Sequence, residues 1–415
     1  METNPSRREF LALGLALPAT GLASATDPAA RSLQSVSQPL APSPVKLAYR
    51  TLGKTGLKVT TVGFGCMTTS DASVVERAAD IGINYFDTAR VYQQGNNERM
   101  VGAALKRKRK DIVLSTKSIT RDKEGALADL ETSLRELGTD YVDIWYLHLK
   151  NTPADVTDDL LEAQQIAKQQ GKIRFSGVST HQGYQELIPM LAKKGLVDVV
   201  LTMYNFSMEK AVEGAIAEAS KAGIGIVGMK VMAGGFRRRP QGPPPSGPGA
   251  PPPGNRPPGG RPPGPRPEPP AQLKQQGAML AALKWVIKDP NVHTTIPGMQ
   301  DMEQLEENLR AMAEPYGPVE EKLLAQQLDL ITPLYCRTCG ECEATCAKGL
   351  PVADVLRYLS YADGYGQFAL AREEYAKLPH ELANVRCRDC EHCTVNCPFG
   401  VQVAVRVSRA QELFA

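Results

Sequence analysis

Four side chains of types that move protons, Asp87, Tyr92, Lys117 and His148, lie at the ends of successive short apolar segments. Hydride reduction of a carbonyl leaves charge on its oxygen, so a general acid must reach that oxygen. Tyr92 can give the proton, although a free phenol titrates at about pH 10. A neighbouring Lys117 ammonium would lower that pKa, and Asp87 would hold and orient Lys117. His148 would position the substrate oxygen or share its proton.

Each of these residues alone is weak support for a site. An Asp at a strand end is commonly a cap or half of an ion pair, and a lone His is commonly structural. The prediction therefore rests on all four occurring together and in order along the chain.

The chain has nine cysteines, and all except Cys66 lie beyond residue 335. They form two runs with the spacing CxxCxxCxxxC, which is typical of bacterial ferredoxins that hold [4Fe–4S] clusters. The first run is Cys336, Cys339, Cys342 and Cys346, and the second is Cys387, Cys390, Cys393 and Cys397. We predict that these thiolates bind two [4Fe–4S] clusters, since four close thiolates suit a cubane better than a zinc site. Disulfide bonds between these cysteines are the alternative, because the N-terminus has the pattern of an export signal, described below, and exported proteins commonly contain disulfides. We favour clusters, because they would be assembled in the cytoplasm before export. Cys66 is predicted to be buried and inert.

The last cysteine of each run is best placed to bind the neighbouring cluster, because three thiolates already surround three corners of a cubane. This crossed arrangement puts one cluster on Cys336, Cys339, Cys342 and Cys397. It puts the other on Cys387, Cys390, Cys393 and Cys346. Alternatively, each run of four holds its own cluster. Residues 351–382 between the runs have a helical pattern, so we predict a small α-helical ferredoxin-like domain over 330–415.

The residues before the cysteines alternate short apolar strands with amphipathic helical segments. Predicted strands are 62–65, 84–87, 112–116, 144–147, 173–178, 197–202, 225–229 and 293–296. Predicted helices include 126–137, 160–169 and 211–222. This α/β pattern fits a closed (β/α)8 TIM barrel better than a doubly wound sheet, because no GxGxxG motif follows the first strand. In such barrels function lies at the C-terminal strand ends, where all four proton-transfer residues fall.

The order and spacing of these four residues resemble the catalytic tetrad of the aldo-keto reductases. The resemblance extends over 49–312, and we assign the barrel to 49–315. It implies hydride transfer between NADP or NAD and a small carbonyl or alcohol, with the tetrad roles given above. Together with its C-terminal cysteines, the chain is similar to the subfamily that carries a C-terminal ferredoxin domain.

The resemblance also implies contacts to the nicotinamide, some of them altered here. In the family a Ser-Asn pair after the fifth strand binds the nicotinamide amide, and this chain has Ser179 and Thr180. Tyr204 begins a matching Tyr-Asn pair, but Leu201 replaces the Gln three residues before it. Met229 takes the place of the aromatic residue that stacks on the nicotinamide ring.

The adenosine end of the cofactor site is better matched. The corresponding residues are Gly298, Glu307 and Asn308. Gln304, however, replaces the basic residue that binds the 2′-phosphate of NADP in relatives. Loss of that cation removes the main preference for NADP over NAD. The identity of the nicotinamide therefore stays open.

The N-terminus has the pattern of an export signal. A twin-arginine pair, Arg7-Arg8, precedes an apolar run over 11–22 and a small-residue cleavage site that ends at Ala25. We predict a twin-arginine signal peptide over 1–25 and a linker over 26–48, and hence a periplasmic or otherwise exported protein. The alternatives are a chance pair in a cytosolic protein and a membrane anchor, but the run is shorter than the roughly 20 residues of a span.

Residues 236–270 are almost entirely Pro and Gly with scattered Arg, which is typical of an extended segment without a core. The insertion follows the seventh strand on the active face of the barrel. We interpret it as a solvated low-complexity loop, with a lid or a docking site for a partner as the alternative.

A net charge of +3 is too small to indicate a nucleic-acid or membrane-binding protein. The sequence therefore predicts an exported oxidoreductase whose two clusters connect carbonyl chemistry to a redox partner protein. The alternative is a non-catalytic iron–sulfur electron carrier or partner-binding protein with a degenerate barrel. The sequence does not identify the substrate.

Overall fold

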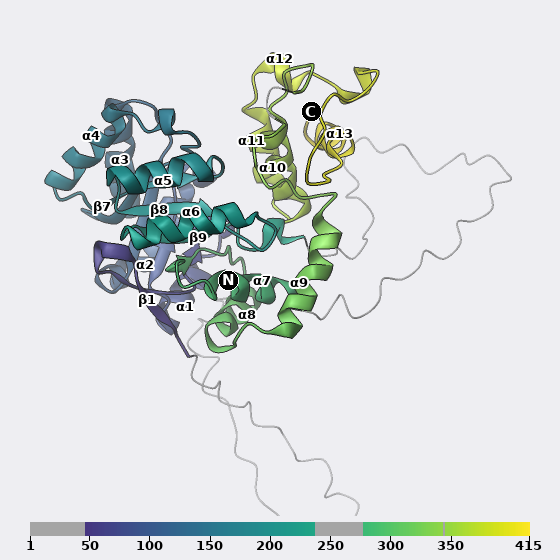
Figure 1. The fold of residues 1–415 in the computed structure, drawn as a ribbon. Helices are drawn as coiled ribbons and strands as arrows, with labels where there is room; N and C mark the ends of the chain where they lie inside the picture. The colour runs from purple at the N-terminus through teal and green to yellow at the C-terminus, as the bar shows by residue number, and fades with distance from the viewer. Residues whose placement is uncertain (1–45, 237–276, 343–344) are drawn as a thin grey trace, which may run out of the picture. The chain divides into compact units, whose positions relative to one another are not determined.

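Residues 46–236, 277–342 and 345–415 are described by a computed structural model (Figure 1). Eight strands form one parallel sheet in the order β10-β9-β8-β7-β6-β5-β4-β3. The strands are β3 (Phe64–Gly65), β4 (Tyr85–Asp87), β5 (Val113–Ser118), β6 (Val142–Leu147), β7 (Ile173–Thr180), β8 (Val199–Met203), β9 (Gly225–Met229) and β10 (Thr294–Thr295). Bridges from Val62 to Thr295 and from Gly65 to Gly298 join the first strand to the last. The sheet therefore closes into the predicted (β/α)8 barrel.

All eight strands overlap their predicted ranges, and the differences lie at the ends. β5 and β7 each run two residues further than predicted, to Ser118 and Thr180. The predicted ranges of these two strands stopped before the polar residues that follow the apolar run. Lys117, Ser118, Ser179 and Thr180 are nevertheless all buried, because successive residues face alternately the interior of the barrel and the surrounding helices, and neither side is open to water.

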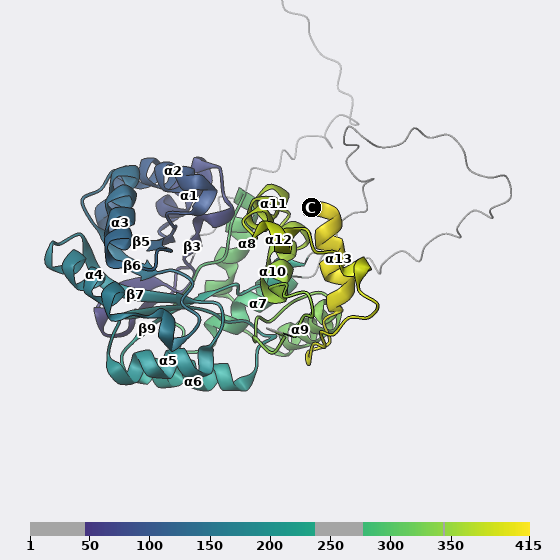
Figure 2. The ribbon, with the colours of Figure 1, turned by 90° about the horizontal axis from the view of Figure 1, so that it is seen from above.

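Helices lie on both sides of the strands in Figure 2. They are α1 (Ala72–Ile81), α2 (Asn96–Leu105), α3 (Lys123–Leu137), α4 (Asp158–Gln169), α5 (Tyr184–Lys194), α6 (Lys210–Lys221), α7 (Ala278–Ile287) and α8 (Met302–Ala313). Side-chain caps fix where several of them begin. The Asp122 carboxylate accepts a hydrogen bond from the Gly125 amide at the start of α3, and Thr157 caps α4 in the same way.

A hairpin that the sequence analysis did not predict, β1 (Tyr49–Thr51) and β2 (Lys58–Thr60), precedes the barrel. Its apolar side chains Leu52, Leu57 and Val59 are buried in one cluster with side chains from inside the barrel. Inside the barrel, the Tyr85 and Tyr146 hydroxyls pair at 2.7 Å.

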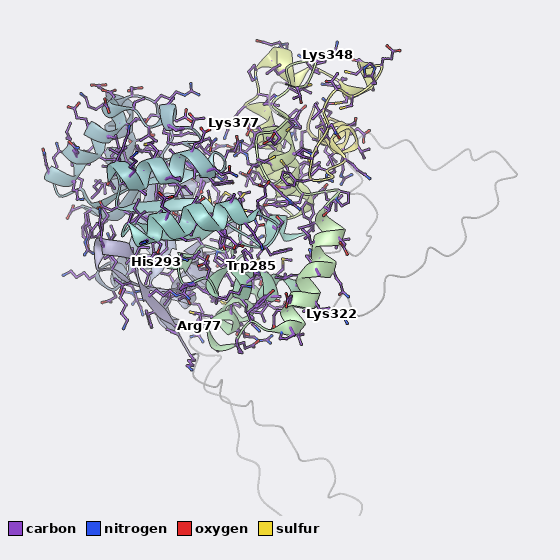
Figure 3. The ribbon with its side chains drawn as sticks, in the orientation of Figure 1. Arg77, Trp285, His293, Lys322, Lys348 and Lys377 are labelled. Carbon is purple, nitrogen blue, oxygen red and sulfur yellow. The ribbon has the colours of Figure 1, made fainter. Side chains whose placement is uncertain are left out.

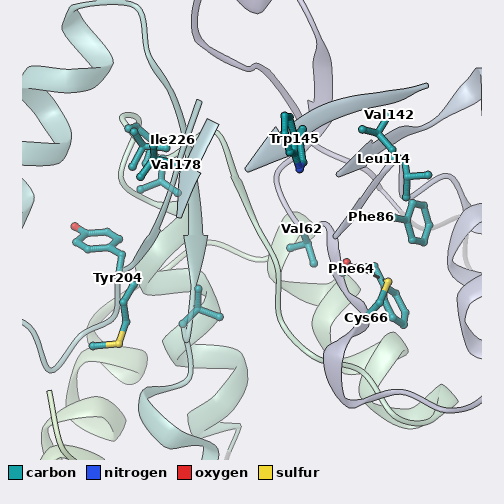
Figure 4. Close-up of a cluster of buried hydrophobic side chains, with 14 of the residues drawn as sticks. Val62, Phe64, Cys66, Phe86, Leu114, Val142, Trp145, Val178, Tyr204 and Ile226 are labelled. Atoms are coloured by element: carbon teal, nitrogen blue, oxygen red, sulfur yellow. Dashed lines mark hydrogen bonds between the residues drawn. The ribbon is translucent and has the colours of Figure 1, made fainter. Parts of the chain in front are cut away.

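The larger core lies between the strands and the surrounding helices (Figure 4). Trp145 is fully buried there, and its indole nitrogen donates to Ser118 Oγ at 3.0 Å. Cys66 belongs to the same core, which confirms its predicted burial. Burial raises the pKa of its thiol, so this cysteine is protonated and unreactive.

The residues after the barrel are helical: α9 (Pro318–Ile331), α10 (Val352–Asp363), α11 (Phe368–Ala376), α12 (His380–Ala383) and α13 (Val403–Phe414). The predicted helical stretch over 351–382 is thus three helices. Gly364 ends α10, and Gly366, with a φ of 70°, carries the turn to α11. The last four helices share a hydrophobic core of their own. Ion pairs from Arg406 and Arg409 to Asp363 connect α13 to the end of α10.

These C-terminal helices contact the active face of the barrel. Gln300, after β10, donates to the Tyr365 carbonyl at 3.3 Å and accepts from Gln367 at 2.8 Å. A Cβ at Gly364 would lie 1.8 Å from the Gly234 carbonyl oxygen, so only glycine allows this approach. The described residues from 46 onward accordingly belong to one compact unit.

The predicted signal peptide, most of the linker and residues 237–270 of the insertion lie outside the described residues. Phe236, which the sequence analysis assigned to the insertion, is instead buried against Tyr335. None of the described helices has both the length and the apolar character that a membrane span requires.

Candidate active site and cysteine-rich region

Asp87 ends β4 and Lys117 lies on the neighbouring strand β5, so their side chains meet at the C-terminal end of the barrel. Lys117 Nζ donates to Asp87 Oδ2 at 2.5 Å and to the Thr88 carbonyl at 2.6 Å. Ser115 Oγ donates to Asp87 Oδ1 at 2.7 Å. Burial alone would lower the pKa of Lys117, but the Asp87 carboxylate and the Tyr92 hydroxyl raise it. Lys117 therefore stays charged.

Tyr92 begins the 3-10 helix η5 (Tyr92–Gly95), shortly after β4. Its hydroxyl accepts a hydrogen bond from Lys117 Nζ at 3.2 Å, and this ammonium lies 4.7 Å from the ring centroid. Gln93 and Gln94 follow in the left-handed region, with φ values of 49° and 55°. Such backbone strain is common beside functional residues.

Burial raises the pKa of Tyr92 to about 12, although Lys117 acts in the opposite direction. Lys117 thus lowers the pKa of Tyr92 as predicted, but burial, which the sequence analysis did not weigh, raises it by more. Removal of water from the phenolate outweighs the attraction of one ammonium that Asp87 already partly neutralises. The phenol is protonated at neutral pH, which is the form that can donate a proton.

His148 follows β6, and its ring stands edge-on to the Tyr92 ring with centroids 6.1 Å apart. Its Nδ1 atom is buried without a hydrogen-bond partner among the described residues. Burial, followed by the charges of Lys117 and Arg357, lowers the pKa of His148 well below its usual range. A neutral imidazole beside a phenol can hydrogen bond to a substrate oxygen.

A cavity of about 460 Å³ opens beside these residues. Its barrel side includes Asp87, Tyr92, His148, Met229 and Gly298. Its opposite side comes from α10 and α11 and includes Arg357, Tyr361, Tyr365, Leu370 and Glu374. The sequence analysis missed this second wall, because no local pattern links these residues to strand ends far away in the chain.

Two further cavity residues were missed although they follow barrel strands. Lys230 comes directly after β9, with a φ of 55°, and His181 comes directly after β7. Their position at C-terminal strand ends was the signal that could have identified them. Burial lowers the pKa of His181 well below its usual range, and Lys230 and Arg357 add to this effect.

The structure brings only part of the predicted cofactor set to the cavity. Gly298 lines it, but Ser179 and Thr180 do not. Ser179 Oγ accepts from the Leu149 amide at 3.2 Å, and Thr180 Oγ1 donates to the Gln182 carbonyl at 2.5 Å. These hydroxyls hold the loop after β7, and their predicted contact with the nicotinamide stays a prediction.

Tyr204 also lies away from the cavity. Its hydroxyl donates to Asp289 Oδ2 at 3.0 Å, and its ring packs against Trp285 of α7, which Figure 3 labels. Tyr204 is therefore packed in the core and is not among the residues that line the described cavity. The sequence analysis assigned Tyr204 to the cofactor site because it matches a Tyr-Asn pair of the family. Sequence position alone does not show in which direction the ring points.

Residues for the adenosine end of a nicotinamide cofactor lie on α8. Asn308 is 2% exposed, and its Nδ2 atom has no hydrogen-bond partner in the part of the chain that the structure describes. Such an orphaned donor suits an adenine nitrogen. Glu307 is half-buried next to it and does not line the cavity. The Gln304 side chain bonds to Asp301 and to the Gln300 amide, so no cation stands at the predicted 2′-phosphate position.

Cysteines from both runs converge on one small cavity after the barrel. The four are Cys336, Cys339, Cys342 and Cys397. This is the grouping that the crossed arrangement predicts. Burial raises the pKa of Cys336 to about 12, and the neighbouring sulfurs of the other three contribute. Four thiols crowded around one space fit a cubane, whose iron ions would hold them as thiolates.

The remaining cysteines form a second neighbourhood. Burial raises the pKa of Cys387, and nearby Cys393, Cys390 and Cys346 add to it. Thr394 joins the two runs, since its hydroxyl donates to the Thr345 carbonyl at 2.7 Å. Among the described residues no three His, Cys, Asp or Glu side chains are close enough for a single metal ion. Ligands of a cubane bind different irons and stand further apart than ligands of one ion.

The first cysteine run is bonded directly to the active-site wall through Thr338. The Thr338 amide donates to Cys336 Sγ at 3.3 Å, and its hydroxyl donates to the His181 carbonyl at 2.7 Å. Thr338 has a φ of 51°, an unfavourable conformation for a β-branched residue. The chain therefore tolerates strain where it connects the cysteines to the cavity.

Comparison with known proteins agrees with this architecture. The profile of the aldo/keto reductase family matches residues 62–322. L-galactose dehydrogenase of Arabidopsis thaliana is 28% identical over 299 residues, which cover 65% of this chain and 89% of that protein. L-glyceraldehyde 3-phosphate reductase of Escherichia coli (strain K12) is 25% identical over 312 residues, which cover 64% of this chain and 88% of that protein.

An uncharacterized oxidoreductase of Bacillus subtilis (strain 168) is 35% identical over 176 residues, but the match spans only 56% of that protein and 38% of this chain. A solved structure, the holo form of an aldo-keto reductase from Bacillus halodurans, aligns with a TM-score of 0.53 and 27% identity. That alignment covers 68% of this chain and 96% of the other. Because the family profile matches more than half of the chain and the barrel aligns with that of a solved reductase, this protein belongs to the aldo/keto reductase family and is an oxidoreductase.

Proposed function

We propose that the protein transfers hydride between a nicotinamide cofactor and a small carbonyl or alcohol at the tetrad of Asp87, Tyr92, Lys117 and His148. The observation that carries this proposal is the position of the Lys117 ammonium, which hydrogen bonds to both Asp87 Oδ2 and the Tyr92 hydroxyl. One cation thus connects a buried carboxylate to the phenol that lines the cavity. General acid catalysis requires a proton donor held in this way.

Each tetrad side chain has one role. The Tyr92 phenol gives its proton to the carbonyl oxygen during reduction and takes it back during alcohol oxidation. Lys117 stabilises the phenolate that forms, and Asp87 keeps the ammonium charged and in place. Neutral His148 hydrogen bonds to the substrate oxygen and orients it. A bound nicotinamide supplies or accepts the hydride.

We assign the nicotinamide end of the cofactor to the cavity beside Met229 and Gly298, which line it. The adenosine end belongs near Asn308, whose buried amide lacks a partner among the described residues. Gln304 provides no charge for a 2′-phosphate, so NAD should bind at least as well as NADP.

The second part of the proposal is that the C-terminal residues form a ferredoxin-like domain with two [4Fe–4S] clusters. The spacing of the cysteines and their two crossed neighbourhoods support it. Each cluster, when bound, transfers one electron at a time. Oxidation of the nicotinamide hydride releases two electrons and one proton, so the electrons would have to enter the two clusters in separate one-electron steps while the proton leaves to solvent.

Thr338 supports an electronic connection between the two parts. Two hydrogen bonds lead from the sulfur of Cys336 through Thr338 to the carbonyl of His181 in the cavity wall. We propose that a redox partner protein exchanges electrons with the clusters, and that the barrel exchanges hydride with the small substrate.

We also propose export. Arg7 and Arg8 precede the apolar run 11–22, in the pattern of a twin-arginine signal. That route carries folded proteins, which agrees with cofactors that are inserted in the cytoplasm before export. The protein would then act in the periplasm or in another exported location.

An anaerobic titration tests the coupled function. The full-length protein is reconstituted with iron and sulfide, and about eight irons per chain are expected for two clusters. NADH and NADPH are then added separately while the broad visible absorbance of the clusters is followed. We expect at least one nucleotide to bleach this absorbance, and the Tyr92→Phe variant to bind that nucleotide equally well.

Two outcomes would contradict the proposal in different ways. Iron content near zero after reconstitution would reject the clusters and leave the barrel chemistry untouched. Clusters that dithionite reduces but neither nucleotide bleaches would separate the barrel from the clusters. The non-catalytic electron carrier would then be the better description of the C-terminal part.

A further inference from the structure

A second group of charged and polar side chains lines the active-site cavity, apart from the tetrad. It consists of Lys230 from the loop after β9, and Arg357 and Tyr361 from α10. Lys230 Nζ lies 4.7 Å from the Tyr361 ring centroid and 5.6 Å from that of Tyr365. The barrel and the C-terminal helices thus build this group together.

Lys230 is held in place by its backbone. It adopts a left-handed φ of 55°, which is costly for a residue with a side chain. Its carbonyl accepts a hydrogen bond from Asn205 Nδ2 at 3.1 Å, and Asn205 is fully buried. In the part of the chain that the structure describes, no carboxylate forms an ion pair with Lys230. A fixed ammonium without a counterion is an open site for an anion.

Arg357 is only partly neutralised. Its Nη2 donates to Asp354 Oδ1 at 2.7 Å, and the Asp354 side chain is 41% exposed whereas that of Arg357 is 14% exposed. The partly solvated Asp354 carboxylate therefore accepts a hydrogen bond from only one nitrogen of the Arg357 guanidinium. Within the described residues the remaining guanidinium N–H groups form no other hydrogen bond, and a planar fork of this kind suits a carboxylate or phosphate.

The positive charge acts on the cavity as a whole. Lys230 and Arg357 both lower the pKa values of His148 and His181, after the larger effect of burial. Glu374 also lines the cavity, but it is paired with Lys377 at 2.6 Å. Lys377 is the third cation that lines the described part of the cavity and is paired with this glutamate, so Lys230 and Arg357 are the two whose charge is not fully paired with a carboxylate.

We propose that Lys230 and Arg357, with the Tyr361 hydroxyl, bind an anionic carboxylate or phosphate group of the molecule that occupies the cavity. The anion belongs either to the substrate, which would then be a carbonyl or hydroxy compound with a carboxylate or phosphate, or to the phosphates of the nucleotide. The anion site itself is independent of turnover, whereas its use in catalysis rests on the proposed function.

Binding of inorganic phosphate tests the site without any reaction. Isothermal titration calorimetry on the anaerobic full-length protein compares the wild type with Lys230→Met and Arg357→Met. We expect each variant to bind phosphate about tenfold more weakly or worse, because each loses a charge-assisted contact. Added salt should weaken binding to the wild type.

Lys322→Met is the control, since Lys322 is exposed and does not line the cavity (Figure 3). This variant should bind phosphate like the wild type. Lys230→Arg and Arg357→Lys keep the charge and should recover most of the affinity, which separates loss of the site from loss of the fold. Absence of phosphate binding to the wild type, or phosphate affinities of both methionine variants equal to that of the wild type, would overturn the proposal.

Two further measurements identify the source of the anion. Nucleotide affinity is measured by fluorescence titration with NADH and NADPH, and substrate preference by the rates with 4-carboxybenzaldehyde and benzaldehyde. Weaker nucleotide binding in the methionine variants, with unchanged aldehyde preference, assigns the site to the nucleotide phosphates. Loss of preference for the carboxylated aldehyde, with unchanged nucleotide affinity, assigns it to the substrate. Failure of all turnover with normal phosphate binding would reject the proposed function and keep the anion site.

Discussion

Lys117 Nζ donates to Asp87 Oδ2 at 2.5 Å although each residue is only 1% exposed. Water contributes almost nothing to the solvation of either charge, so each depends on the other and on neighbouring polar groups. The Thr88 carbonyl and the Ser115 hydroxyl complete those interactions. The pair therefore links the stability of the barrel to the chemistry of Tyr92.

Replacement of one partner should be costly. Asp87→Asn leaves the Lys117 ammonium buried without its counterion, and we expect a loss of about 3–5 kcal/mol in the free energy of unfolding. Chemical denaturation followed by circular dichroism measures this loss. Asp80→Asn is the control, because Asp80 pairs with Lys108 at the exposed surface and should matter little. Equal effects of the two changes would show that the buried pair has no special importance.

The Tyr92→Phe change should separate chemistry from structure. It removes the proton donor but not the ring that stands against His148, so folding should be preserved. We expect kcat for carbonyl reduction to fall by roughly 100-fold to 10,000-fold, the range for a general acid. Steady-state kinetics with a panel of aldehydes measure this effect. Tyr141→Phe, outside the cavity, should keep the wild-type rate.

The pH dependence of the same reaction follows from the Tyr92 pKa, which burial raises to about 12. The protonated phenol is the donor, so reduction should not decline through loss of this proton below about pH 10, and it should decline as the pH approaches 12. The contrary outcome is a rate of carbonyl reduction that declines from near neutral pH in the wild type but not in Tyr92→Phe. That result would show that Tyr92 loses its proton near neutral pH and that the bound cofactor lowers its pKa against the effect of burial.

The tetrad was predictable because each member follows a strand with a clear apolar pattern, and parallel strands of a barrel end at the same face. Arg357 and Tyr361 were not predictable, because their place in the cavity depends on how α10 packs against a loop more than 100 residues earlier. The net direction of the Tyr92 pKa also escaped the sequence analysis. It depends on burial, which the types and spacing of the residues do not reveal.

Cysteine substitutions distinguish crossed from sequential clusters. In the crossed arrangement Cys336→Ser and Cys397→Ser disturb the same cluster, although the residues belong to different runs. Electron paramagnetic resonance of the dithionite-reduced protein should therefore show the same altered signal in both variants. Cys346→Ser should instead alter the signal that Cys387→Ser alters. If Cys346→Ser behaves like Cys336→Ser, each run holds its own cluster.

The histidines of the cavity predict a specific response of stability to acid. Burial holds the pKa of His181 well below the value of about 6.5 that it has in the unfolded chain. Between those two pKa values the unfolded state binds a proton and the folded state does not. The contribution of His181 is therefore complete above about pH 6.5 and decreases as the pH falls below it.

His181→Gln removes this proton-binding site without touching the tetrad. On going from pH 8 to pH 5.5, the wild type should lose about 1 kcal/mol more of unfolding free energy than the variant. Urea denaturation at both pH values, with equal iron content, measures the difference. His148 still titrates in the variant, so the acid response should shrink but not vanish. His380→Gln on the exposed helix α12 should leave the response unchanged, and an identical response of His181→Gln and the wild type would place a proton on folded His181 at pH 5.5.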